Sequence, residues 1–255
     1  MLDFFATSQS GAQGHLKAVN RRRDKFEKKW APVISKALQA QINTIIRSLR
    51  KGKRFNVPNK PLFDVLDAML HDIAGAFISL ALRDIEKELK SHSAEHIAAQ
   101  RAADAYIKDV IPTRLNQINA ATKRTVQGII QSATEANPDL TASALRSVIV
   151  GDVTEWWAAN DVARTGLIAT TETTLGSEAG IDAAMNTIER PVLKIWQTSF
   201  QNSRDTHIAA SGQSQKMEDP FTVGGGQLMF PGDGSLDAPV GESINCHCAR
   251  TFEIQ

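Results

Sequence analysis

Apolar residues recur at helical spacing through the first 190 residues, and this periodicity constrains the fold more than any other feature of the chain. Members of the first apolar stripe are four, four, three and four residues apart, which places them on one face of a helix. This helix is expected to end near Gly52. The stripe consists of Ile34, Leu38, Ile42, Ile45 and Leu49.

Further helices are expected before residue 190. Prolines within 54–61 end the first helix, because a proline disfavours helical geometry in the residue before it. A second stripe follows, and Pro112 is expected to break the chain ahead of a third. An Asn-Pro-Asp sequence at 137–139 precedes Thr141, a suitable N-cap, and residues 153–186 have a helix-like pattern. The second stripe is Leu62, Leu66, Met69, Ile73, Ala76 and Leu80, and the third is Leu115, Ile118, Val126, Ile129 and Ala133.

The composition changes at Pro191. Residues 192–196 favour a strand, and residues 221–223 and 228–230 predict a β-hairpin around a Gly-Gly-Gly turn. We therefore predict a mainly α protein, with a long-helix, basic-armed N-terminal region at 1–150 and a C-terminal module at 151–255. The module would comprise a helix at 153–186 and a small, loop-rich α+β part at 190–255.

Charge is distributed unevenly along the chain. The formal net charge is only +1, yet residues 1–54 contain 13 Lys or Arg against 3 Asp or Glu. Such a basic arm attracts phosphate backbones, although a solvated helix face is the alternative. The candidate contact residues are Arg21, Arg22, Arg23, Lys25, Lys28, Lys29, Arg50, Lys51, Lys53 and Arg54.

No membrane span or signal peptide is expected. The longest apolar run, at 73–82, is bounded by Asp72 and Arg83 and is too short to cross a bilayer. The N-terminus has no basic flank before an apolar core. We expect a soluble protein with reduced thiols that is made inside a cell.

The two cysteines of the chain, Cys246 and Cys248, are one residue apart. In an extended segment, residues i and i+2 point to the same side, so both sulfurs can face one Zn²⁺ ion. His207 is the candidate third ligand, and Asp205 or His247 the fourth. The alternative is a pair of small buried thiols in a core.

Asp205 and His207 also fit a metal-dependent hydrolase or nuclease, with one group as general base and the other on a metal that activates water. No nucleophile elbow, HExxH helix or phosphate-binding glycine loop supports this interpretation. We therefore expect no catalytic residues, with the hydrolase kept as the alternative.

Residues 196–252 resemble the phage head morphogenesis family, the Mu F-like minor head proteins. Members carry a Trp-bearing strand, Arg-x-x-His, a downstream Gly, a Phe-containing hairpin, a Pro-Gly-Asp turn and a terminal Asn-Cys-Arg-Cys. Here His247 replaces the last Arg. The helical stretch at 164–172 is also similar. The matching framework is Trp196, Arg204, His207, Gly212, Phe221, Asp233, Asn245, Cys246 and Cys248.

The resemblance implies a bacteriophage virion component that is made in the host cytoplasm and joins the prohead at the portal vertex. Its expected partners are the portal protein, the major capsid or scaffolding protein and double-stranded DNA, with several copies per virion. Some relatives leave the capsid with the genome, and the family has no established reaction. A structural Zn²⁺ would hold the module together. Arg204 would pair with Asp233 or Glu242, or contact a partner.

Overall fold

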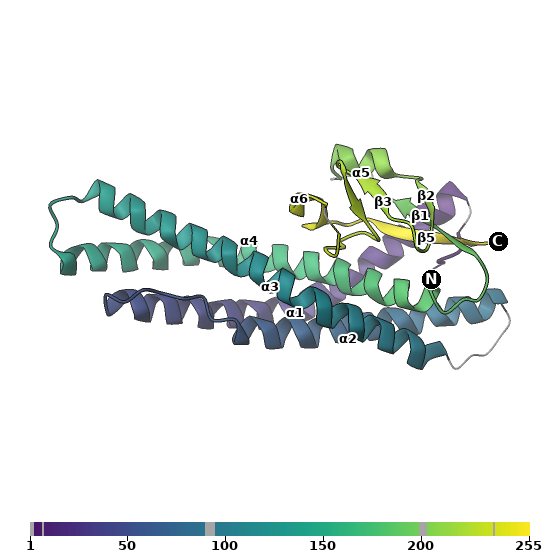
Figure 1. Cartoon of the computed structure of the whole chain (residues 1–255), viewed down its shortest axis with the longest axis horizontal. Coiled ribbons are helices and arrows are strands. Elements are labelled where there is room, and N and C mark those ends of the chain that lie inside the picture. Colours follow the sequence, from purple (N-terminus) through teal and green to yellow (C-terminus); the bar gives the residue numbers. More distant parts are fainter. Residues whose placement is uncertain (1–2, 7, 90–94, 199–202, 237) are drawn as a thin grey trace.

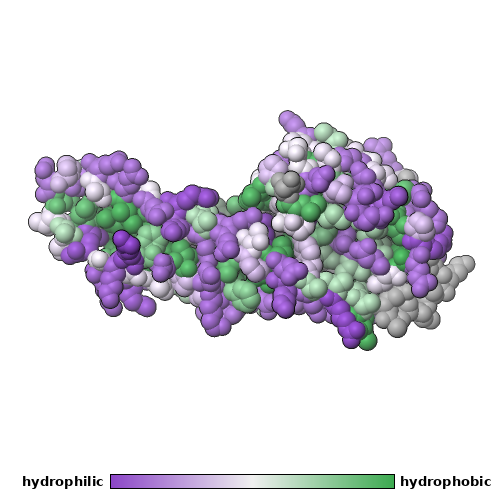
Figure 2. Space-filling model, in the orientation of Figure 1, coloured by the Kyte–Doolittle hydropathy of each residue, from purple (hydrophilic) through white to green (hydrophobic). Residues whose placement is uncertain are grey.

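Four long helices form an elongated bundle in the computed structural model, which describes residues 3–6, 8–89, 95–198, 203–236 and 238–255. Figure 1 shows a small module seated at one end of the bundle, beside the N-terminal part of α1. Figure 2 shows that the molecule is thicker at the end that carries the module. The mainly α class with a C-terminal α+β module is confirmed. The helices are α1 (Gln9–Arg50), α2 (Lys60–Leu89), α3 (Glu95–Ala136) and α4 (Ala142–Met185).

The helix ends follow local chain chemistry. α1 stops at Arg50, and Gly52 beyond it has a φ of +63° that glycine adopts without strain. The hydroxyl of Thr141 accepts a hydrogen bond from the Ala144 amide, so the predicted N-cap is confirmed. The helix predicted at 153–186 therefore begins earlier, at Ala142, and the boundary placed between residues 150 and 151 falls inside it.

The break predicted at Pro112 is wrong, because α3 runs through it. An interior proline costs about 3 kcal/mol in a helix. Apolar residues on both sides of it, Ile107, Ile111 and Leu115, are buried in the core. Their burial, at roughly 1.5–3 kcal/mol each, outweighs the loss of one helical hydrogen bond.

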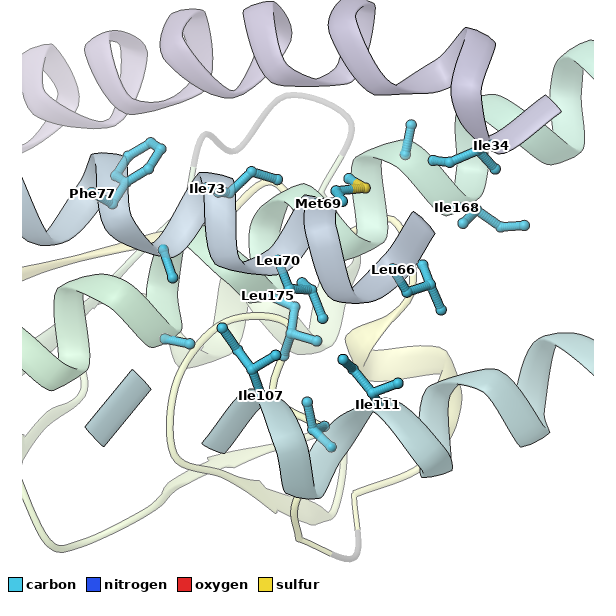
Figure 3. Packing of buried hydrophobic residues seen from close by; sticks show 14 of the residues in the cluster. Ile34, Leu66, Met69, Leu70, Ile73, Phe77, Ile107, Ile111, Ile168 and Leu175 are labelled. Atoms are coloured by element: carbon cyan, nitrogen blue, oxygen red, sulfur yellow. The ribbon is translucent and has the colours of Figure 1, made fainter. Parts of the chain in front are cut away.

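α2 and α4 approach each other closely where Gly180 passes Ala74. A Cβ atom added to Gly180 would lie 2.5 Å from the carbonyl oxygen of Ala74, so no larger residue fits there. Leu70, Ile73 and Leu175 fill the space beside this crossing, and residues of α1 and α3 complete the core (Figure 3). The predicted apolar stripes thus face one shared interior.

α2 is also long and apolar enough to cross a membrane, with a mean hydropathy of 1.6 over its most apolar window. Of that window, 56% is buried inside the protein. A core helix of a folded bundle meets the same criteria of length and composition. The observed packing against α1, α3 and α4 accounts for its apolar character.

The module is built on a three-stranded antiparallel sheet with the order β2-β1-β5. Its strands are β1 (Val192–Gln197), β2 (Ser214–Lys216) and β5 (Ala249–Ile254). The short helices α5 (Asp205–Ala210) and α6 (Val240–Ser243) flank it. The predicted hairpin is present as β3 (Phe221–Val223) and β4 (Gly226–Leu228), so its second strand begins two residues before the predicted 228–230.

A buried carboxylate joins the module to the bundle. Glu178 of α4 is fully buried and receives Arg23 of α1 at 2.6 Å and Arg250 of β5 at 2.8 Å. Arg250 also lies 2.6 Å from Asp182, one turn further along α4. Two helices and the last strand thus meet at one charged group.

Removing this carboxylate should destabilise the whole protein. We expect Glu178→Ala to lower the free energy of unfolding by about 3–5 kcal/mol, because it leaves two buried guanidinium groups without a shared partner. Asp64→Ala removes one member of an exposed ion pair with Lys60 and should change it by about 0.5 kcal/mol or less. Urea denaturation of the parent and both variants measures the difference. Equal stabilities for the two variants would contradict this account of the junction.

Candidate metal centre

Three buried side chains converge from two separate segments of the module. His207 lies on α5, whereas Cys246 and Cys248 lie in the extended segment that leads into β5. Their ligand atoms all lie within 4.8 Å of one another, and the group could hold a metal ion. Among the described residues this is the one such group. The pairing of His207 with the two cysteines is therefore confirmed at the level of geometry.

The cysteine segment is attached to the bundle through its backbone. The carbonyl oxygen of Cys246 accepts a hydrogen bond from the Thr174 hydroxyl at 2.6 Å. That of Cys248 accepts one from Arg23 at 2.7 Å, and that of His247 one from Asn20 at 3.1 Å. Helices α1 and α4 thus fix the direction in which the two sulfurs point.

The imidazole of His207 is held at both ring nitrogens. Nδ1 lies 3.3 Å from the Cys248 sulfur and 3.6 Å from the Cys246 sulfur. Nε2 lies 3.0 Å from a carboxylate oxygen of Glu242, which also accepts a hydrogen bond from the Thr206 hydroxyl. A metal-binding histidine usually donates its second N–H to such a carboxylate. Glu242 thereby orients the ring with Nδ1 toward the sulfurs.

The two thiols differ in acidity. A hydrogen bond with Cys248, together with burial, raises the pKa of Cys246 well above its usual value. The same bond lowers the pKa of Cys248, with Thr198 and Trp196 acting in the same direction. Burial acts to lower the pKa of His207, but the contact with Cys246 raises it above the usual value. Cys248 is thus the first of the pair to form the thiolate that a metal requires.

Neither predicted fourth ligand joins the group. His247 is exposed because it lies between two residues that point inward from an extended segment. Asp205 is also exposed, because residues two apart on a helix point in nearly opposite directions. A cavity of about 210 Å³ opens onto the three ligands and is lined also by Ser203, Arg204, Asn245 and His247. It has room for a water molecule beside them.

The other framework residues build the walls of this centre. Trp196 of β1 is fully buried, and its ring meets His207 at 5.7 Å and Phe221 at 5.3 Å, both edge-on. Gly212 has a φ of +85°, and its amide donates to the Trp196 carbonyl. Asp233 is buried and accepts hydrogen bonds from Tyr106 of α3 and from backbone and side-chain groups of its own turn. These residues support the ligands and the contact with the bundle.

Asn245 has an exposed side chain, and its backbone takes a φ of +53°, which asparagine tolerates. The ion pair predicted for Arg204 is wrong. Arg204 was expected to pair with Asp233 or Glu242. It donates instead to the Ile244 carbonyl at 2.5 Å, because Asp233 is turned toward α3.

The predicted contact residues of the basic arm lie in two separate regions of the structure. Arg21, Arg22, Lys25 and Lys28 are exposed on α1, where the acidic residues Asp24 and Glu27 are interspersed. Lys29 pairs with Asp72 at 2.7 Å. The second group lies at the other end of α1, where Arg146 of α4 is close to Gly52. This group consists of the exposed residues Arg50, Lys51, Lys53 and Arg54.

Arg23 was predicted to be one of the contact residues of the basic arm, and this prediction is wrong. Only 1% of it is exposed, and it bonds to Glu178, Ser177 and the Cys248 carbonyl. The sequence places it in a run of three arginines, so charge alone gave no sign that one of them turns inward. A usable signal was the polar series on α4, Thr171, Thr174, Glu178 and Asp182, which recurs at helical spacing and so marks one polar face of that helix.

Comparisons with models of protein families, with curated proteins and with solved structures return no match for this chain.

The ligand set predicts how metal content responds to substitution. We expect the parent protein, purified without chelator, to contain about one equivalent of a transition metal, because two thiols and an imidazole supply three ligands for one ion. A Cys246→Ser, Cys248→Ser variant should lose it. Asp205→Asn and His247→Gln are matched controls that should retain it. Elemental analysis by mass spectrometry measures all four, and absence of metal from the parent would leave the group as buried thiols.

Proposed function

We propose that this chain is a structural minor head protein of a tailed bacteriophage, related to the Mu F-like head morphogenesis proteins. One observation carries the proposal. The residues that resemble the family, from Trp196 to Cys248, gather in one small module and contact one another or the bundle. Contacts of this kind stabilise the folded module. They fit a structural role in assembly better than a catalytic role.

Zinc is the metal that we propose for the centre. Zn–S and Zn–N bonds of about 2.3 and 2.0–2.1 Å at tetrahedral angles separate sulfur from nitrogen by roughly 3.6 Å. The distances of 3.3 and 3.6 Å from Nδ1 of His207 to the two sulfurs are close to this value. Thiolate and imidazole ligands also select zinc over magnesium or calcium. The ion would fasten α5 to the segment before β5 in a module whose own apolar core is small.

The bundle is the part that we assign to assembly contacts. It extends away from the module (Figure 1), so its far end can reach a neighbouring protein or nucleic acid. We propose that it contacts the portal protein at the portal vertex, with major capsid or scaffolding protein nearby and several copies in each virion. The protein would be made in the host cytoplasm and carried in the virion head.

An image of the particle tests this proposal. A reconstruction of proheads, calculated without imposed symmetry, should contain a helical rod about 60 Å long beside the portal, the length of a 42-residue helix. The module should form a wider end on that rod. Purified proheads and virions that contain none of this protein would contradict the proposal.

The far end of the bundle is our proposed DNA contact. Arg50, Lys51, Lys53 and Arg54 are exposed there, and no acidic partner is paired with them among the residues that the structure describes. Asp24 and Glu27 are interspersed among the cations around Arg21, so these cations form a weaker site for phosphate. We take the end of the bundle, with four adjacent cations, as the contact.

Salt-dependent binding tests the DNA contact. Replacing all four residues at the end of the bundle by glutamine should weaken binding to duplex DNA and reduce its salt dependence, by about 0.9 in the logarithmic slope for each phosphate that the variant no longer neutralises. The matched control replaces Arg21, Arg22, Lys25 and Lys28 by glutamine. An equal weakening of binding in both variants would contradict the assignment.

An assay for cleavage of the same duplex DNA tests the hydrolase alternative, which the open cavity beside the ligands favours. In a catalytic zinc site, a water occupies the position that protein ligands leave open. Against this alternative, Glu242 is engaged by both His207 and Thr206 and is not free as a base. Structural zinc leaves the DNA intact, whereas a nuclease cuts it in a metal-dependent manner.

A further inference from the structure

A groove of about 510 Å³ lies between α3, α4 and α6, at the junction of the bundle and the module. Figure 2 shows apolar surface at the step where the module rises from the bundle. The groove wall is mainly apolar, and a volume of this size is typical of a ligand site. Its apolar side chains include Ile118, Leu167, Ile168, Val240 and Ile244.

Two of these apolar residues are exposed to solvent. Leu167 of α4 is 42% exposed and Val240 of α6 is 44% exposed, although both lie beside a large buried core. They approach the groove from opposite sides, one from the bundle and one from the module. A partner that covers both would remove apolar surface from water, which favours binding.

The groove also carries excess positive charge. Arg114 is neutralised by Glu172, with nitrogen to oxygen distances of 3.1 and 2.9 Å. Arg164 donates only to neutral groups, the Ile118 carbonyl and the Thr122 hydroxyl, and Arg124 is exposed. Neither has an acidic partner within the described part of the chain. Burial lowers the pKa of Arg164, so a nearby anion would offset the cost of burying its charge.

One acceptor in the groove lacks a donor. The Oε2 atom of Glu172 is buried, and no hydrogen-bond partner reaches it among the described residues. The backbone of a peptide carries N–H donors, whereas an ionised fatty acid carries none. The groove therefore combines an apolar wall, uncompensated arginines and an acceptor that needs a donor.

We propose that this groove binds a peptide segment of a partner protein that presents apolar side chains together with carboxylates. The apolar side chains would cover Leu167 and Val240, and the carboxylates would pair with Arg124 and Arg164. Backbone N–H groups would supply the donor. This site is separate from the metal ligands, and its existence does not depend on the virion assignment.

The test uses a short fluorescein-labelled peptide of leucine and glutamate residues and the full chain. Fluorescence anisotropy should give saturable binding to the parent. Leu167→Glu places a carboxylate in the groove, and Arg124→Gln removes a cation, so each should weaken binding roughly tenfold or more. Val162→Glu, at a residue that is 85% exposed on the same helix, and Lys123→Gln are controls that should bind like the parent. Circular dichroism checks that all variants are folded.

Several results would overturn the proposal. Absence of saturable binding to the parent would do so, as would an equal weakening in the groove variants and their controls. A peptide with lysine in place of glutamate that binds as tightly would remove the role of the arginines. Displacement of the peptide by dodecanoate at lower concentration than by unlabelled peptide would identify a small amphiphile as the ligand instead.

Discussion

The structure depends on one buried carboxylate, that of Glu178. It lies where α1, α4 and β5 meet, and it receives a guanidinium from each of the other two elements. These elements are far apart in the sequence, so the ion pairs define how the module sits on the bundle. A buried ion pair of this kind adds less to stability than its Coulomb energy suggests, but it strongly penalises arrangements that leave one charge alone. Its main effect is therefore on specificity of docking.

The geometry of the candidate metal centre depends on this junction. Arg23 reaches past Glu178 to the Cys248 carbonyl, and Thr174, one helical turn before Glu178, holds the Cys246 carbonyl. The bundle therefore orients the two thiols, while Glu242 orients His207 from the module side. His207 and the two cysteines are thus positioned by different elements. A metal ion bound to all three would stabilise the module once it has packed against the bundle. A small core around Trp196 and Phe221 would then need less stability of its own.

Helical periodicity predicted the bundle well because burial on one face of a helix leaves a regular pattern in the sequence. The stripe at 34–49, the N-cap at Thr141 and the hairpin at 221–228 depend on neighbouring residues alone. Pro112 was misread because tertiary packing outweighs a local preference that is visible in the sequence. The pairing of His207 with both cysteines was also predictable, since residue type and alternation limit which side chains can meet.

The remaining features of the site depend on three-dimensional context. Asp205 and His247 are chemically suitable ligands, and only the backbone direction turns them away from the sulfurs. Arg23 differs from Arg21 and Arg22 only in the face of α1 that it occupies. Glu242 was considered as a partner of Arg204, but its place beside His207 depends on how α6 packs against α5. Spacing in the sequence carries no information on such contacts between distant segments.

Zinc-edge X-ray absorption of the purified protein tests the central claim most directly, because it reports the ligand atoms around the metal. The account predicts two sulfur neighbours at about 2.3 Å and nitrogen or oxygen neighbours at about 2.0–2.1 Å. A protein that contains no zinc, or zinc surrounded only by nitrogen and oxygen, would contradict it.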